Sequence, residues 1–111
     1  MQAAKVAARV DGDRSRHYYI RGFSMRGWEY LASNEPLSAI KAFNSALDYD
    51  GSDLDSRHGL AKGLARLGQW DKASEALLEV LRANRDMREP VALDPDFVEL
   101  RKRPEIRRAL R

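Results

Sequence analysis

The two histidines of the chain, His17 and His58, are its first candidates for metal binding or acid–base chemistry. A helical metal site needs a second ligand one turn away, and neither histidine has one three or four residues after it. Asp53 and Asp55 precede His58, but acids at the start of a helix are stabilised by the helix dipole without a metal. We therefore expect no metal site.

Other catalytic chemistry has little support. The chain has no cysteine, which excludes disulfides, thiolate metal ligands and a cysteine nucleophile. No serine stands in an arrangement with histidine or lysine that is typical of an activated nucleophile. No glycine-rich loop follows a strand, so a phosphate-binding motif is absent. The sequence predicts neither an enzyme nor a cofactor, and its function has to be sought in binding.

The composition favours helices and limits the chain to one domain. Its 111 residues suit a single core, and alanine, leucine, arginine and glutamate recur while β-branched residues are scarce. No apolar run approaches the roughly 20 residues that span a membrane, so no membrane contact is expected. The first ten residues lack the apolar stretch of a secretory signal. The sequence identifies no compartment, although a cytoplasmic location is slightly favoured.

Positive charge gathers at the C-terminus. The net charge is +3, but residues 101–111 contain six basic side chains and one acidic side chain, so the first hundred residues sum to −2. We interpret this run as the solvated face of a terminal helix. Contact with nucleic acid or another acidic partner is a less favoured alternative, because acidic residues are spread over the rest of the chain.

Two segments of the chain match when the sequence is shifted by 34 residues without a gap. Small residues fall on small ones and large apolar residues on large ones. The matching pairs include Gly27 with Ala61, Tyr30 with Leu64, Asn34 with Gly68, Ala39 with Ala73, Phe43 with Leu77, Ala46 with Val80 and Leu47 with Leu81. A period of this length is typical of stacked helical hairpins.

Turn residues divide each unit into two helices. In the first unit, residues 34–36 form the turn, with Asn34 expected to cap the second helix and Pro36 tolerated in its opening turn. Residues 50–53 end that helix, and Asp53 is expected to cap the next one. Gly68 supplies the turn of the second unit.

Residues 23–53 and 54–84 resemble the tetratricopeptide repeat. Gly27 and Ala61 match the small residue of that family's helix A, Phe43 and Leu77 match the large residue of helix B, and residues 67–73 are the most similar stretch. The resemblance implies an all-α fold, in which helical hairpins stack as a short right-handed superhelix with flanking capping helices.

The expected organisation is a single domain over residues 1–111. It comprises an N-terminal flanking segment (1–18), a first repeat (20–53), a second repeat (54–87) and C-terminal capping helices (94–111). Residues 11–13 are expected to separate a short N-terminal helix from the first repeat, whose first helix begins as early as Arg16. In the tail, Asp94 is expected to cap a helix that opens with Pro95, and Phe97 and Leu100 to anchor it on the second repeat.

The resemblance also implies a protein–protein interaction scaffold that holds a peptide or partner segment in a concave groove lined by the A helices. The groove positions are Arg21, Ser24, Trp28, Leu31, Asp55, His58, Lys62 and Arg66. Trp28 is expected to point away from the intra-repeat contact, as a binding hot spot beside three basic or protonatable groups. Such a surface suits a partner segment with one apolar residue and one or two acids. The alternative for Trp28 is packing under the N-terminal helix. The alternative for the whole domain is self-association as a homo-oligomer.

Overall fold

The computed structural model describes residues 12–111, and helices are the only regular secondary structure in that range. The four longer helices are α2 (Gly12–Ala32), α3 (Pro36–Tyr49), α4 (Leu54–Arg66) and α5 (Trp70–Ala83). Short helices follow, namely η1 (Arg85–Met87), α6 (Arg88–Leu93), η2 (Pro95–Phe97), η3 (Leu100–Lys102) and α7 (Pro104–Ala109). None of these helices is both long enough and apolar enough to cross a membrane.

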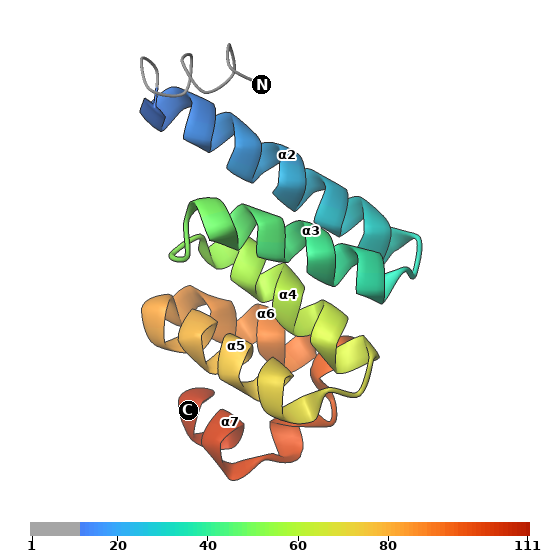
Figure 1. Ribbon diagram of the computed structural model, residues 1–111. Coiled ribbons are helices and arrows are strands. Elements are labelled where there is room, and N and C mark those ends of the chain that lie inside the picture. Colours follow the sequence, from blue (N-terminus) through green and yellow to red (C-terminus); the bar gives the residue numbers. More distant parts are fainter. Residues whose placement is uncertain (1–11) are drawn as a thin grey trace.

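The helices stack in chain order. Helix α2 pairs with α3 and α4 pairs with α5, while α4 also packs on α3 and touches α2. Figure 1 shows these two hairpins one above the other, with α7 closing the stack beyond α5. The resulting body is elongated, with extents of 49 × 27 × 19 Å. The predicted all-α fold of stacked helical hairpins is confirmed.

Both hairpin turns have the same backbone geometry. Asn34 and Gly68 have positive φ values of 55° and 74°. In each turn, the next residue donates its N–H back to the last helical turn, from Glu35 to the Tyr30 carbonyl (2.8 Å) and from Gln69 to the Leu64 carbonyl (3.0 Å). This is the left-handed ending that glycine and asparagine provide. The prediction that Asn34 caps α3 is therefore wrong, because Asn34 ends α2 and Glu35 takes the N-cap position without a side-chain bond.

Small residues let the helices approach closely. Ala39 and Ala73, which are equivalent in the two units, are both fully buried. The ring of Phe43 lies in the space that Gly27 of α2 and Gly59 of α4 leave open. Phe43 and Leu77 are fully buried as well, and each such side chain contributes about 1.5–3 kcal/mol through the apolar surface that it removes from water.

Helix α2 begins earlier than the sequence indicated. Its first residue is Gly12, so residues 12–18 are helical turns of α2 and no break separates them from the first repeat. Tertiary contacts hold this part of the helix: the Arg16 Nε donates to the Tyr49 carbonyl at 2.5 Å, and the ring of Tyr19 stacks on that of Tyr49 with centroids 5.1 Å apart. The short helix predicted before residue 11 lies outside the described residues.

The C-terminal segment is an integral part of the core. Asp94 accepts the N–H of Asp96 and caps η2, as predicted, and Phe97, Leu100 and Ile106 are fully buried. Residues 85–87, which were expected to belong to the second repeat, form η1, and residues 88–93, which were assigned to no unit, form α6. The proline in α6 falls near the start of that helix, where its missing N–H breaks no helical bond.

Candidate functional site

A single carboxylate joins the two helices on which the groove was predicted. Arg21, Ser24, Trp28 and Leu31 lie on α2, whereas Asp55, His58, Lys62 and Arg66 lie on α4. The Ser24 hydroxyl donates to Oδ2 of Asp55 at 2.6 Å, and the Trp28 indole N–H donates to the same oxygen at 3.0 Å. Asp55 therefore fixes the position of α2 against α4 and sets the orientation of the indole.

Trp28 packs more deeply than the sequence indicated. Its ring meets the ring of Phe43 edge-on, with centroids 5.3 Å apart, and the ring of His58 in a similar way at 5.4 Å. The expectation that Trp28 points away from the intra-repeat contact is wrong, because Phe43 belongs to the other helix of the same repeat. The indole is nevertheless half-buried rather than buried, and part of it stays open to solvent.

The basic side chains of α4 are engaged within the chain. The Lys62 ammonium donates to Asp94 and lies 3.1 Å from Asp96, and the Arg66 Nε pairs with Asp96 at 3.1 Å. Another Arg66 nitrogen donates to the Leu31 carbonyl at 2.6 Å. These ion pairs join α4 to the segment that begins η2, so Lys62 and Arg66 are not available as isolated cations.

His58 takes up a proton less readily than a solvent-exposed histidine. It lies between the rings of Trp28 and Phe97, with the latter centroid 6.1 Å away. Burial, and then the positive charge of Lys62, lower the pKa of His58 below its usual value, against the opposing effect of Asp94 and Asp55. The predicted surface of an aromatic anchor beside three basic groups is therefore not what the fold presents.

Two further predicted site residues are covered by the chain itself. Ser24 is 5% exposed and Leu31 is 4% exposed, so neither side chain offers area to a partner. Arg21 is exposed on α2. Of the remaining five predicted positions, Asp55 and Arg66 are exposed, whereas Trp28, His58 and Lys62 are half-buried.

A hollow of about 460 Å³ opens at Arg21, Trp28 and Asp55, between α2, α4 and the turn that leads into α4. It is lined by His17, Ile20, Arg21, Ser24, Met25, Trp28, Asp50, Asp53 and Asp55. Sequence reasoning missed Asp50 and Asp53, because they belong to a turn whose position beside α2 depends on the tertiary packing. Met25 had a sequence signal, since it stands three residues before Trp28 on the same helix.

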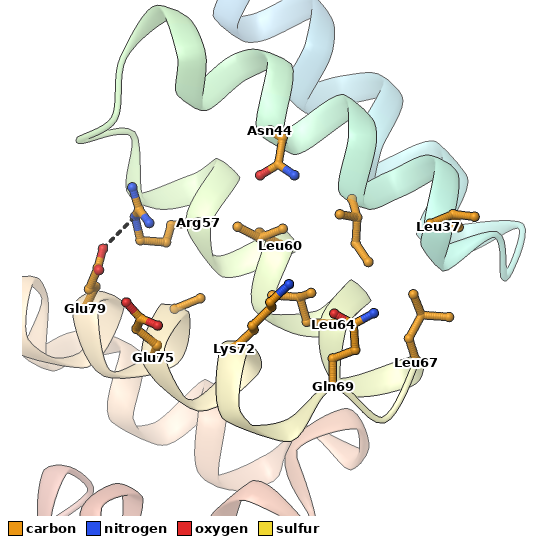
Figure 2. A pocket seen from close by; sticks show the side chains of 12 residues that line it. Leu37, Asn44, Arg57, Leu60, Leu64, Leu67, Gln69, Lys72, Glu75 and Glu79 are labelled. Carbon is orange, nitrogen blue, oxygen red and sulfur yellow. Dashed lines mark ion pairs between the residues drawn. The ribbon is translucent and has the colours of Figure 1, made fainter.

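A second hollow, of about 300 Å³, lies over another face of α4 and is walled by α3 and α5. Figure 2 shows Leu60 and Leu64 on its floor and Arg57 paired with Glu79 at one end. That pair measures 2.9 Å. From α4, Asp55 lines the first hollow and Arg57, two positions later, lines the second, so the two hollows lie on nearly opposite sides of the helix. This second hollow was not predicted.

Part of the basic C-terminal run is also engaged within the chain. Arg103 meets Asp71 at 2.8 Å, Lys102 meets Glu99 at 3.0 Å, and Arg101 donates to the backbone carbonyls of Val91 and Asp94. These contacts give half of the six basic side chains a structural role. Among residues 12–111, no cluster of three or more histidine, aspartate or glutamate side chains has the arrangement of a metal site.

The fold defines a helical-repeat protein built from two stacked hairpins and a closing segment. A model of the tetratricopeptide repeat matches residues 30–101, and the chain therefore belongs to the tetratricopeptide-repeat family. No curated protein and no solved structure matches it. Members of this family typically mediate protein–protein interactions and are not enzymes.

Proposed function

We propose that this domain holds a segment of a partner protein in the hollow between α2 and α4. The observation that carries the proposal is the hollow itself, in which a half-buried tryptophan is surrounded by charged side chains. Its volume of about 460 Å³ lies within the range of sites that accept ligands. Partly buried tryptophans are enriched among the residues that dominate binding energy.

The hollow is preformed. The hydrogen bond from Trp28 to Asp55 and the contacts with Phe43 and His58 hold the indole in one orientation. A partner therefore does not have to order this side chain on binding, which removes an entropic cost of about 0.5–1.5 kcal/mol for a flexible side chain.

The test uses surface residues of the hollow, because Trp28 also packs on the core. Peptides that bind the wild-type domain are selected from a displayed random library. Changes in the domain's amide and indole chemical shifts then show where each selected peptide binds. We expect the largest shifts at Met25, Asp55 and the Trp28 indole, and we expect Met25→Ala and Arg21→Glu to change affinity. Leu93→Ala is the control, because Leu93 is exposed and does not line the hollow. Shifts confined to the second hollow or to α7 would contradict the proposal.

Self-association through α2 is the second candidate. Tyr18 and Met25 are 64% and 60% exposed and stand seven residues apart, which places two large side chains on one face of the helix. Sedimentation over a range of concentrations tests this function. A monomer at every concentration excludes it, and an oligomer that Tyr18→Ser dissociates supports it.

A further inference from the structure

We propose that the segment held in the hollow between α2 and α4 is cationic and apolar, with an arginine or lysine beside an apolar side chain. This inference rests on the proposed function. The proposed charge of the partner segment is opposite to the one expected from the sequence, which indicated an acidic partner.

The lining of the hollow is net negative. Its described residues contribute three carboxylates, from Asp50, Asp53 and Asp55, and one permanent cation, Arg21. Among residues 15–111, whose side chains the structure describes, none forms an ion pair with any of the three carboxylates. Arg16 lies near Asp50 but donates to the Tyr49 carbonyl, so the uncompensated charge is greatest at Asp53 and Asp55.

Neutral donors hold these carboxylates in place without cancelling their charge. Asp55 accepts from Ser24 and Trp28, both through Oδ2, and Asp53 accepts from Ser56 through its own Oδ2. The other oxygen of each carboxylate accepts no hydrogen bond from a described residue. It can therefore accept one from a bound ammonium or guanidinium group, and such charge-assisted bonds are about twice as strong as neutral ones.

The apolar part of the hollow lies beside the charge. Ile20, Met25 and the open part of Trp28 line the same cavity as Asp55. The indole nitrogen is 3.0 Å from Asp55, so a guanidinium paired with this carboxylate lies close to the indole as well. An arginine can thus pair with Asp55 while a neighbouring apolar side chain contacts Met25 and the open part of Trp28.

An acidic segment has no comparable set of binding partners in this hollow. The cations it needs, Lys62 and Arg66, are already paired with Asp94 and Asp96. Phe97 follows directly and is buried near Lys62, whose nitrogen lies 5.8 Å from the centre of its ring. The chain's own tail therefore supplies the two acids and the apolar residue that a partner was expected to bring.

The experiment compares two synthetic peptides of equal length, one alternating arginine with leucine and the other alternating glutamate with leucine. The domain has a net charge of +3, so non-specific attraction favours the glutamate peptide, and a preference for the arginine peptide has to arise locally. We expect the arginine peptide to bind and to shift the Trp28 indole signal. Asp55→Asn keeps an acceptor for Ser24 and Trp28 and should weaken binding by roughly tenfold, which is about 1.4 kcal/mol. Asp48→Asn, on the exposed side of α3, is the matched control.

The outcomes separate this inference from the proposed function. Binding of the glutamate peptide in the hollow, weakened by Met25→Ala, overturns the cationic assignment and leaves the proposed function standing. Binding of the arginine peptide that Asp55→Asn leaves unchanged also overturns the assignment. If neither peptide binds and library selection gives no binder sensitive to Met25→Ala or Arg21→Glu, the proposed function itself is wrong.

Discussion

The ring of Phe43 lies so close to Gly59 that a Cβ atom on Gly59 would come within 2.1 Å of the ring's Cζ. The same ring would lie 2.6 Å from a Cβ on Gly27. Phe43 therefore fills the junction between α2, α3 and α4, and Trp28 rests on it from the side of the hollow. The position of the proposed binding residue thus depends on two glycines in the core.

Replacing Gly59 by alanine should destabilise the domain. The new methyl group has no room unless the Phe43 ring moves, and overpacking of this kind costs about 1–3 kcal/mol. Urea unfolding measures the loss. The control is Gly22→Ala, where nothing lies within 4 Å of the added atom and a helical alanine should gain about 0.5–1 kcal/mol. Equal stability of the two variants would contradict the packing of Phe43 on Gly59.

Ala73→Leu tests the register of the second repeat. Ala73 is fully buried where α5 crosses its neighbour, so a leucine there should cost about 1–3 kcal/mol and lower the melting temperature. Ala83→Leu adds the same atoms at an exposed position of the same helix and should have little effect. If Ala73→Leu leaves the melting temperature unchanged, Ala39 and Ala73 do not occupy equivalent positions in the two repeats.

Phe97→Ala tests whether the tail belongs to the core. Phe97 is fully buried, and its truncation should cost about 3–5 kcal/mol. Its neighbour Val98 is 44% exposed, so Val98→Ala is a matched change with a small expected cost. Truncation after Asn84 should expose the same apolar face and cause aggregation. A soluble, cooperatively folding truncated chain would show that the tail is dispensable.

Stability should fall as the pH drops below about 6.5, the usual pKa of histidine. Because burial and Lys62 lower the pKa of folded His58, the unfolded chain takes up a proton at a pH where the folded domain does not. The unfolding free energy is therefore highest above the unfolded pKa, and it decreases as the pH falls from that value towards the folded one. Asp55 and Asp94, which also face His58, reduce the effect without reversing it.

The midpoints of urea unfolding, measured between about pH 7.5 and about pH 5.5, give the pH dependence of the unfolding free energy. This range is chosen because most carboxylates titrate below it. His58→Gln should flatten the curve. A slope that survives His58→Gln would assign the pH dependence to another group.

The sequence alone determined the repeat. The matches at 34 residues, such as Ala39 with Ala73 and Phe43 with Leu77, identified side chains that are fully buried in the fold. Equivalent positions also predicted equivalent turns at Asn34 and Gly68, although the part played by Asn34 was assigned wrongly. These features could be predicted because helix periodicity and turn conformation depend on residues within a few positions of one another.

Only the tertiary structure decided the charge of the candidate site. Lys62 and Arg66 have no acidic neighbour along the helix that signals their pairing, and their partners Asp94 and Asp96 stand some thirty positions later in the chain. Asp50 and Asp53 likewise reach the hollow only because the turn before α4 folds beside α2. Coulomb energy depends on distance in space and on burial, not on separation in sequence. The repeat pattern could therefore place the groove residues on their helices, while the packing of the turn and the tail determined which of their charges remain uncompensated.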